Sequence, residues 1–159
     1  MKKGSTFFLK TVLIIIGLVV LSGLLFFPNI EGRNVNHNLF QIYFQDPFLA
    51  YIYLSSTPFF FALYQAFKLL GLIEHNKTFT HLGVARLRNI KFCALAFAGF
   101  LLPITPYLFA FAQDDDAPGV VLIGIVLVFV SLVVATAAAV FQTLLQNAVD
   151  IKNENDLTV

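Results

Sequence analysis

The chain has 159 residues, of which 58% are hydrophobic and 12% are charged, whereas soluble domains carry a charged fraction of about 25%. This composition excludes an intrinsically disordered chain, a collagen-like fibre and a nucleic-acid-binding domain, so we expect no direct contact with nucleic acid. The net charge is +1 and the mean hydropathy is +0.83, which together are typical of an integral membrane protein.

The charged residues leave four long uncharged stretches between them, at residues 11–30, 47–67, 92–113 and 117–149. A helix rises about 1.5 Å per residue, so each stretch is long enough to cross a hydrocarbon core of about 30 Å. We therefore predict an all-α fold, a four-transmembrane-helix bundle that forms a single integral membrane domain. The predicted helices lie at about residues 7–27, 48–70, 90–112 and 118–146, and a cytoplasmic tail follows at 147–159.

The first apolar stretch follows Lys2 and Lys3, as the core of a secretory signal peptide would. It is long for such a core, and no A-x-A cleavage site follows it. We therefore interpret this stretch as an uncleaved first transmembrane helix.

The positive charges predict the orientation. Nine of the ten Lys and Arg residues precede the first predicted helix, lie between the second and third, or belong to the tail, and Arg33 is the exception. Cytoplasmic segments of membrane proteins carry an excess of Lys and Arg. We therefore expect a multi-pass protein of the plasma membrane with both termini in the cytoplasm.

The loop between the second and third predicted helices, residues 68–91, carries half of the positive charge. Its second part predicts a short basic cytoplasmic helix that Thr80 can cap and that continues into the third membrane helix. Arg86, Arg88 and Lys91 in this part are candidate contacts. They suit either a partner protein or anionic lipid, and the residues alone do not decide between the two.

Hydroxyl residues accompany prolines inside two predicted helices. They are Ser55, Ser56, Thr57 and Pro58 in the second helix, and Pro103, Thr105 and Pro106 in the third. Two helices broken by proline can frame a midplane ligand site, as in transporters. Alternatively, the hydroxyls only satisfy freed carbonyls at packing kinks. We favour packing, because no ionisable residue occupies the central part of any predicted span.

Small residues recur every four positions in the fourth predicted helix, at Ser131, Ala135 and Ala139. Such a face lets two helices approach closely. It can pack inside the bundle, which we favour, or form a homo-oligomer.

The connection before the fourth predicted helix is acidic, and it ends at Asp116, two residues before Pro118. Asp is a preferred N-cap residue, and proline fits the first helical turn. Asp114 and Asp115 add carboxylates that could attract a hard cation, but their spacing does not form a defined loop site. We therefore predict that Asp116 caps the fourth helix.

No combination of residues for catalysis occurs within a predicted span: no Ser/His pair, no Asp/Asp pair and no HExxH motif. The single cysteine, Cys93, cannot form an internal disulfide, and no Cys/His spacing indicates zinc. We therefore expect neither enzymatic activity nor a cofactor.

Several segments together resemble one bacterial family. They are KGSTFFLK at 3–10, PFFFALYQA at 58–66, NIK at 89–91, DDAPG at 115–119, LLQNAVDIK at 144–152 and ENDLTV at 154–159. The pattern resembles the small YoaS-like membrane proteins of Gram-positive bacteria, a domain-of-unknown-function family. The resemblance implies a four-pass protein of the bacterial plasma membrane and supplies no catalytic residues. It also implies a cytosolic helix-turn-helix regulator as a candidate partner.

These observations predict a non-enzymatic regulatory or sensing protein whose residues 68–91 and 150–159 contact a cytosolic protein. One alternative is a small transporter or channel-forming oligomer, with a path lined by residues 55–58 and 103–106. Another is an immunity or envelope-stress protein that shields the membrane from a toxin. The residues alone do not separate these roles.

Overall fold

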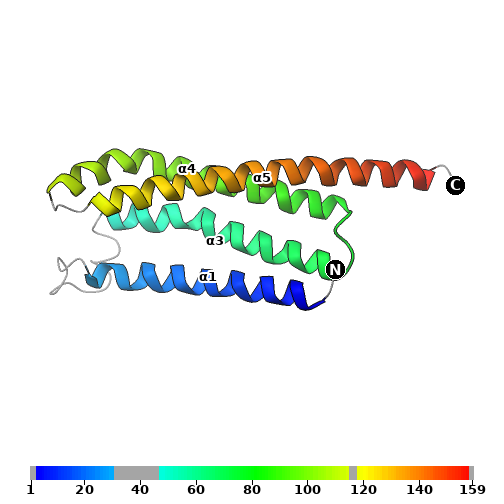
Figure 1. Cartoon of the computed structure of the whole chain (residues 1–159), viewed down its shortest axis with the longest axis horizontal. Helices are drawn as coiled ribbons and strands as arrows, with labels where there is room; N and C mark the ends of the chain where they lie inside the picture. Colours follow the sequence, from blue (N-terminus) through cyan, green and yellow to red (C-terminus); the bar gives the residue numbers. More distant parts are fainter. Residues whose placement is uncertain (1–2, 31–46, 115–117, 158–159) are drawn as a thin grey trace.

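The structure of the protein, a computed structural model, describes residues 3–30, 47–114 and 118–157 (Figure 1). These residues form four long helices: α1 (Lys3–Ile30), α3 (Pro47–Glu74), α4 (His81–Asp114) and α5 (Pro118–Leu157). Each helix contains a segment that is long and apolar enough to cross a membrane. The prediction of an all-α fold with four long apolar helices packed together is therefore confirmed.

The basic segment before the third membrane span is helical and runs into that span without a break. Residues 81–91 form the first turns of α4, which continues as one helix to Asp114. No proline interrupts α4 before Pro103, and Arg and Lys are good helix formers, so the helix has no reason to stop at residue 91. The connection between α3 and α4 is accordingly reduced to residues 75–80.

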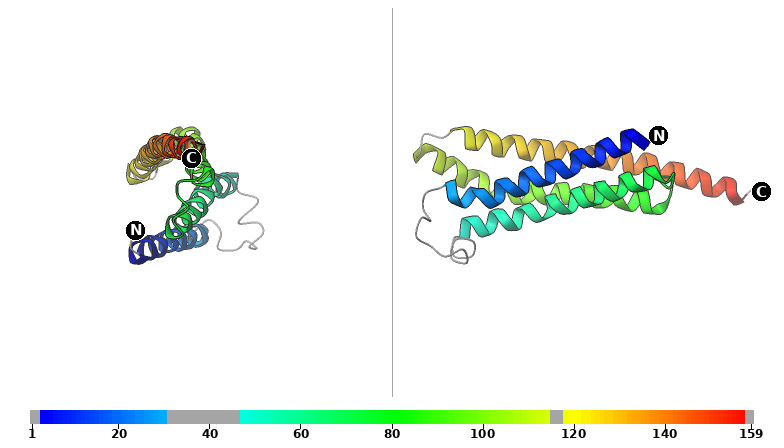
Figure 2. Two further views of the ribbon diagram at one scale, coloured as in Figure 1. Left: turned by 90° about the vertical axis from the view of Figure 1, so that its right-hand side faces the viewer. Right: turned by 90° about the horizontal axis from the view of Figure 1, so that it is seen from below.

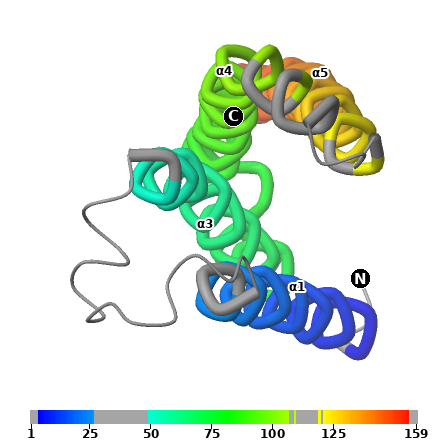
Figure 3. Tube along the Cα trace, turned by 90° about the vertical axis from the view of Figure 1, so that its left-hand side faces the viewer, coloured from blue at the N-terminus to red at the C-terminus, as the bar shows by residue number. Residues whose placement is uncertain are grey.

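The four helices form an open, curved row in which each helix packs against its neighbour along the chain. The contacts join α1 to α3, α3 to α4 and α4 to α5. The left panel of Figure 2 and Figure 3 show the row end-on, with α1 and α5 at its two edges. Within the described residues these two helices share no comparable contact, so the expected bundle does not close into a ring. Lipid chains are as apolar as leucine, so an open row is compatible with a membrane.

The most extensive packing joins α4 to α5. The buried residues of α5 are three, four or seven positions apart, as in a left-handed coiled coil. They are Gly124, Ser131, Ala135, Ala138, Leu145 and Val149. Because the residues in the middle of this α4–α5 seam are small, the two backbones can approach closely.

One contact sets the register of the α4–α5 seam. A Cβ atom on Gly83 would lie 3.1 Å from Cδ2 of Leu145, so the start of α4 lies beside the last part of α5. Counting back along the two antiparallel helices places Ala98 opposite Ser131. Both residues are buried, which agrees with this register.

The turn between α3 and α4 ends one helix and starts the next within residues 75–80. Asn76 has a left-handed backbone with φ 55°, and its N–H donates to the carbonyl of Ile73 at 3.2 Å. The N–H of Lys77 donates to the carbonyl of Leu72 at 2.8 Å, which completes a Schellman motif. The carbonyl of Thr80 then accepts from the Gly83 N–H at 2.9 Å and begins α4.

Replacing Gly83 by alanine is expected to destabilise this turn. The new Cβ would lie 2.3 Å from the carbonyl oxygen of Thr78, so the backbone of the turn must move. Such overpacking costs about 1–3 kcal/mol, so Gly83→Ala should lower the thermal unfolding midpoint of the protein in detergent. Gly71→Ala, where nothing lies within 4 Å of the added Cβ, is the matched control and should be neutral or slightly stabilising. Equal midpoints for the two variants would contradict this account of the turn.

Candidate functional site

All Lys and Arg residues in the described part of the chain lie at one end of the row, which we call the basic end. They are Lys3, Lys10, Lys68, Lys77, Arg86, Arg88, Lys91 and Lys152. The arrangement follows from the antiparallel order of the helices, which brings the start of α1, the α3–α4 turn and the end of α5 together (Figure 1). The basic end is therefore where the chain can meet charged ligands.

Arg86 contacts another helix of the same chain rather than the surroundings. Its Nη1 donates to Oε1 of Gln65 on α3 at 2.7 Å, and Gln65 is only 3% exposed. This part-buried bond satisfies the buried Gln65 side chain, which lies near the end of the uncharged stretch of α3. Gln65, which the sequence reasoning did not single out, is therefore a residue that positions Arg86 and joins α3 to α4.

The other two candidate contacts of α4 lie on a different side of the helix. Successive residues in a helix are about 100° apart, so Arg88 and Lys91 share a side that Arg86 does not. Arg88 is exposed, and Lys91 is half-buried with its Nζ 4.9 Å from the centre of the Phe92 ring. The three predicted contact residues thus do not form a single surface.

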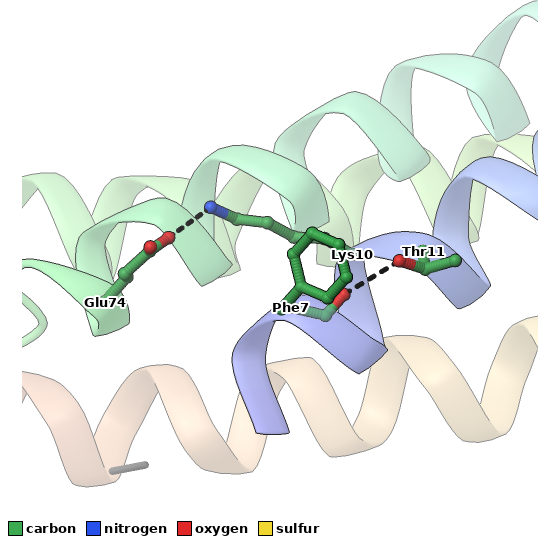
Figure 4. A network of polar contacts seen from close by, with 4 residues as sticks. All are labelled: Phe7, Lys10, Thr11 and Glu74. Atoms are coloured by element: carbon green, nitrogen blue, oxygen red, sulfur yellow. Dashed lines mark hydrogen bonds and ion pairs between the residues drawn. The ribbon is translucent and has the colours of Figure 1, made fainter. Parts of the chain in front are cut away.

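Figure 4 shows an ion pair that joins α1 to α3 at the basic end. Lys10 Nζ lies 2.5 Å from Oε2 of Glu74, and the same ammonium group lies 5.5 Å from the centre of the Phe67 ring. At the opposite end of the row the hydroxyl of Tyr53 donates to the carbonyl of Leu24 at 2.8 Å. Polar contacts at both ends therefore hold α1 in place against α3.

The hydroxyl groups before Pro58 donate to carbonyls of their own helix. Ser55 Oγ donates to Ile52 at 2.8 Å, and Ser56 Oγ donates to Tyr53 at 2.7 Å. Thr57, which is exposed, has its Oγ1 3.4 Å from the same Tyr53 carbonyl. These hydroxyls therefore bond within α3, but Pro58 frees the carbonyl of Leu54, which none of these three bonds reaches.

The two proline segments lie at different levels along the row. The Tyr51 hydroxyl of α3 donates to the Phe100 carbonyl of α4 at 2.7 Å, so these residues share a level. Residues 55–58 lie on the basic-end side of that level, whereas Pro103, Thr105 and Pro106 lie on the other side. Thr105 Oγ1 donates to the carbonyl of Leu101 at 3.0 Å, again within its own helix. The structure does not bring the residues of the suggested midplane site together.

The small residues of α5 take part in the α4–α5 seam. Ser131 and Ala135 are buried there, and the Ser131 hydroxyl donates to the carbonyl of Leu127 at 2.7 Å. Ala139 is only half-buried, and its neighbour Ala138 takes the next buried position. A coiled-coil seam alternates steps of four and three residues. The step after Ala135 is three, so Ala138 is buried in place of the predicted Ala139.

Two other expectations concern ions. Asp116, the predicted cap of the fourth helix, lies outside the described residues. Among residues 3–30, 47–114 and 118–157, no group of three His, Cys, Asp or Glu side chains is placed to hold a metal ion.

A groove of about 590 Å³ opens at the basic end between the α3–α4 turn and the last turns of α5. Its lining comes from two segments far apart in the sequence: Asn76, Lys77, Phe79 and Thr80 from the turn, and Ala148, Ile151 and Lys152 from α5. We call this the basic groove. It combines two ammonium groups with an apolar floor, so it suits a ligand that is anionic at one end and apolar at the other.

The hydrogen bond between Gln65 and Arg86 gives a test of the α3–α4 contact. Gln65→Leu should leave the half-buried guanidinium without its partner, at a cost of about 1–3 kcal/mol, and lower the thermal midpoint in detergent. Gln65→Leu combined with Arg86→Leu removes both polar groups and should recover most of the loss. A double variant as unstable as the sum of the two single variants would contradict the pairing.

The α4–α5 seam gives a second test. Ala135, 3% exposed, faces α4, whereas its near neighbour Ala137 is exposed. Ala135→Leu should push the helices apart and reduce the fraction of protein that stays monodisperse after heating, as measured by size-exclusion chromatography. Ala137→Leu adds the same atoms outside the seam and should leave that fraction unchanged. Equal losses for both would show that α5 does not pack through this face.

Comparison with known proteins agrees with the membrane architecture. Residues 33–159 match a family described as "Protein of unknown function (DUF2975)". The chain is 45% identical over 162 residues, which cover all of both chains, to the "Uncharacterized membrane protein YoaS" of Bacillus subtilis (strain 168). No solved structure matches the chain. The resemblance to YoaS-like proteins is thus confirmed, and the chain belongs to the DUF2975 family of multi-pass membrane proteins.

Proposed function

We propose that this protein is a non-enzymatic regulatory or sensing component of the bacterial plasma membrane that engages a cytosolic protein. In this proposal the basic end faces the cytoplasm, so both chain ends are cytoplasmic. The charge distribution supports this orientation, because all the Lys and Arg residues of the described part of the chain lie at that end. A cytosolic regulatory protein is the proposed partner.

The observation that carries the proposal is the length of α5. This helix runs from Pro118 to Leu157 without interruption and extends past the α3–α4 turn (Figure 1). Beyond Val149 it leaves α4, and residues 150–155 are all exposed. We call residues 150–157 the α5 projection. Apart from Ile151 and Lys152, which line the basic groove, the α5 projection offers exposed side chains to a soluble partner.

The α5 projection is also connected to the membrane part of the protein. Val149 is 2% exposed and packs with Leu145 and Val84 where α4 begins, and Leu87 lies against this cluster. The projection therefore continues the same helix that forms the α4–α5 seam. A change in the packing of that seam would tilt or rotate the projection, and a bound partner would sense it through one rigid element.

A side-chain hydrogen bond stabilises the helix where the α5 projection begins. Gln146 Nε2 donates to Oδ1 of Asp150 at 2.8 Å, a pair of side chains four residues apart on one side of the helix. Such a pair stabilises a helix by about 0.2–0.5 kcal/mol. The partner would thus meet a helix whose first turn is already formed, which lowers the entropy lost on binding.

Site-specific photo-crosslinking in living cells tests the proposal. A photoreactive residue in place of Asn153, in the α5 projection, should yield a reproducible adduct with one cytosolic protein. The same residue in place of Val133, which is exposed in the middle of α5, should yield none. A chain that lacks residues 153–159 should reach the membrane at normal levels but no longer co-purify with that protein. The absence of a reproducible adduct at 153, or co-purification that survives the truncation, would refute the proposed role.

A further inference from the structure

We propose that the basic groove binds the headgroup of an anionic phospholipid, with Lys77 and Lys152 holding the phosphate and the apolar floor contacting the start of an acyl chain. This lipid site goes beyond the proposed function, because it needs no cytosolic partner. It also lies apart from Arg86, Arg88 and Lys91, the residues that the sequence suggested for lipid contact.

The fold brings two cations together that are far apart in the sequence. Lys77 follows the end of α3 and Lys152 belongs to α5, yet both line the basic groove. Within the described part of the chain, the ion pair that forms joins Lys10 to Glu74, and neither lysine of the groove takes part in one. Two ammonium groups around one cavity attract an anion, and lysine binds phosphate as a compact point charge.

The carboxylates that flank Lys152 in the sequence do not line the groove. Asp150 and Glu154 each lie two residues, or about 200°, from Lys152 around α5, and Asp150 accepts a hydrogen bond from Gln146 at 2.8 Å. Neither carboxylate belongs to the lining, whereas Asn76 and Thr80 do. The lining therefore carries positive charge and neutral polar groups, and its charge complements a phosphodiester.

The depth of the groove favours a lipid over a soluble ligand. The uncharged stretch of α5 ends at Val149, and Ile151 and Lys152, which line the groove, follow within about 5 Å along the helix. Each headgroup layer of a bilayer is about 5–8 Å thick, so this wall of the groove lies at the level of the phospholipid headgroups.

The apolar part of the groove lies beside the cations. Phe79 and Ile151 line the groove and are 57% and 59% exposed, and Leu82, one turn after Phe79, is 59% exposed. In water these side chains would be uncovered, but beside a lipid they contact its glycerol and upper acyl atoms. Each of the two segments that line the groove supplies one lysine and one large apolar side chain, a combination that matches the two chemistries of a phospholipid at an interface.

Lipid retention by the full-length protein tests the site. The protein would be purified from vesicles of equal parts phosphatidylglycerol and phosphatidylcholine, and the retained lipids would be counted by native mass spectrometry. The wild-type chain should retain phosphatidylglycerol in preference to phosphatidylcholine. Lys77→Gln combined with Lys152→Gln should weaken that retention roughly tenfold or more, since each lysine near an anionic surface supplies a factor of about five.

The matched control is Lys68→Gln combined with Arg88→Gln, which removes the same charge from the basic end but outside the groove, and it should retain phosphatidylglycerol normally. Lys77→Arg with Lys152→Arg should also retain it. Equal loss in the groove variant and the control would show only a general surface attraction and would overturn the proposal. So would unchanged retention in the groove variant, or loss of the crosslinked cytosolic protein in that variant without loss of lipid, since the occupant would then be a protein.

Competition with inorganic phosphate tests whether the groove binds a whole phospholipid or only a phosphate group. Added at millimolar concentration during purification, phosphate should leave phosphatidylglycerol in place, because it cannot replace the acyl contacts to Phe79 and Ile151. Full displacement by phosphate would overturn the lipid assignment. The chain that lacks residues 153–159 keeps the whole groove and should retain the lipid, so failure of the lipid site and failure of the partner proposal are distinguishable.

Discussion

The close packing of α4 against α5 is the contact on which the rest of the structure depends. Small residues such as Ala98, Ser131 and Ala135 allow the two helices to approach, and Leu145 and Val149 close the seam at the basic end. Because the seam reaches the first turn of α4, the α3–α4 turn is held beside the last turns of α5. The basic groove depends on this seam, because its lining comes from the α3–α4 turn and from the last turns of α5.

The main features of the fold could be predicted from the sequence because they depend on local properties. The length of an apolar stretch determines whether a helix can cross a bilayer, and four stretches predicted four helices. The open row could not be predicted in this way, since it depends on which sides of the helices pack. The predicted span at 90–112 is one part of the longer helix α4, whose first turns correspond to the expected basic helix, because Lys and Arg extend a helix readily.

The candidate site was harder to predict because it combines distant segments. Residues 68–91 and the tail were each expected to contact a partner, but nothing in their sequences indicates that Lys77 and Lys152 line one cavity. Gln65 carried a usable signal, since a long polar side chain in an apolar stretch needs a partner. The hydroxyls at residues 55–57 bond to carbonyls of their own helix, one or two residues before the carbonyl that Pro58 frees, a detail that composition does not reveal.

The open row has a consequence for how the protein is made. Every extensive contact joins helices that follow one another in the chain, so each helix meets its packing partner as soon as the next one emerges from the ribosome. No helix has to wait for a distant segment to close a ring, which keeps the contact order low and favours rapid assembly. The α4–α5 seam forms last, and with it the basic groove, so the surface that we propose for lipid becomes complete only when the whole chain has entered the membrane.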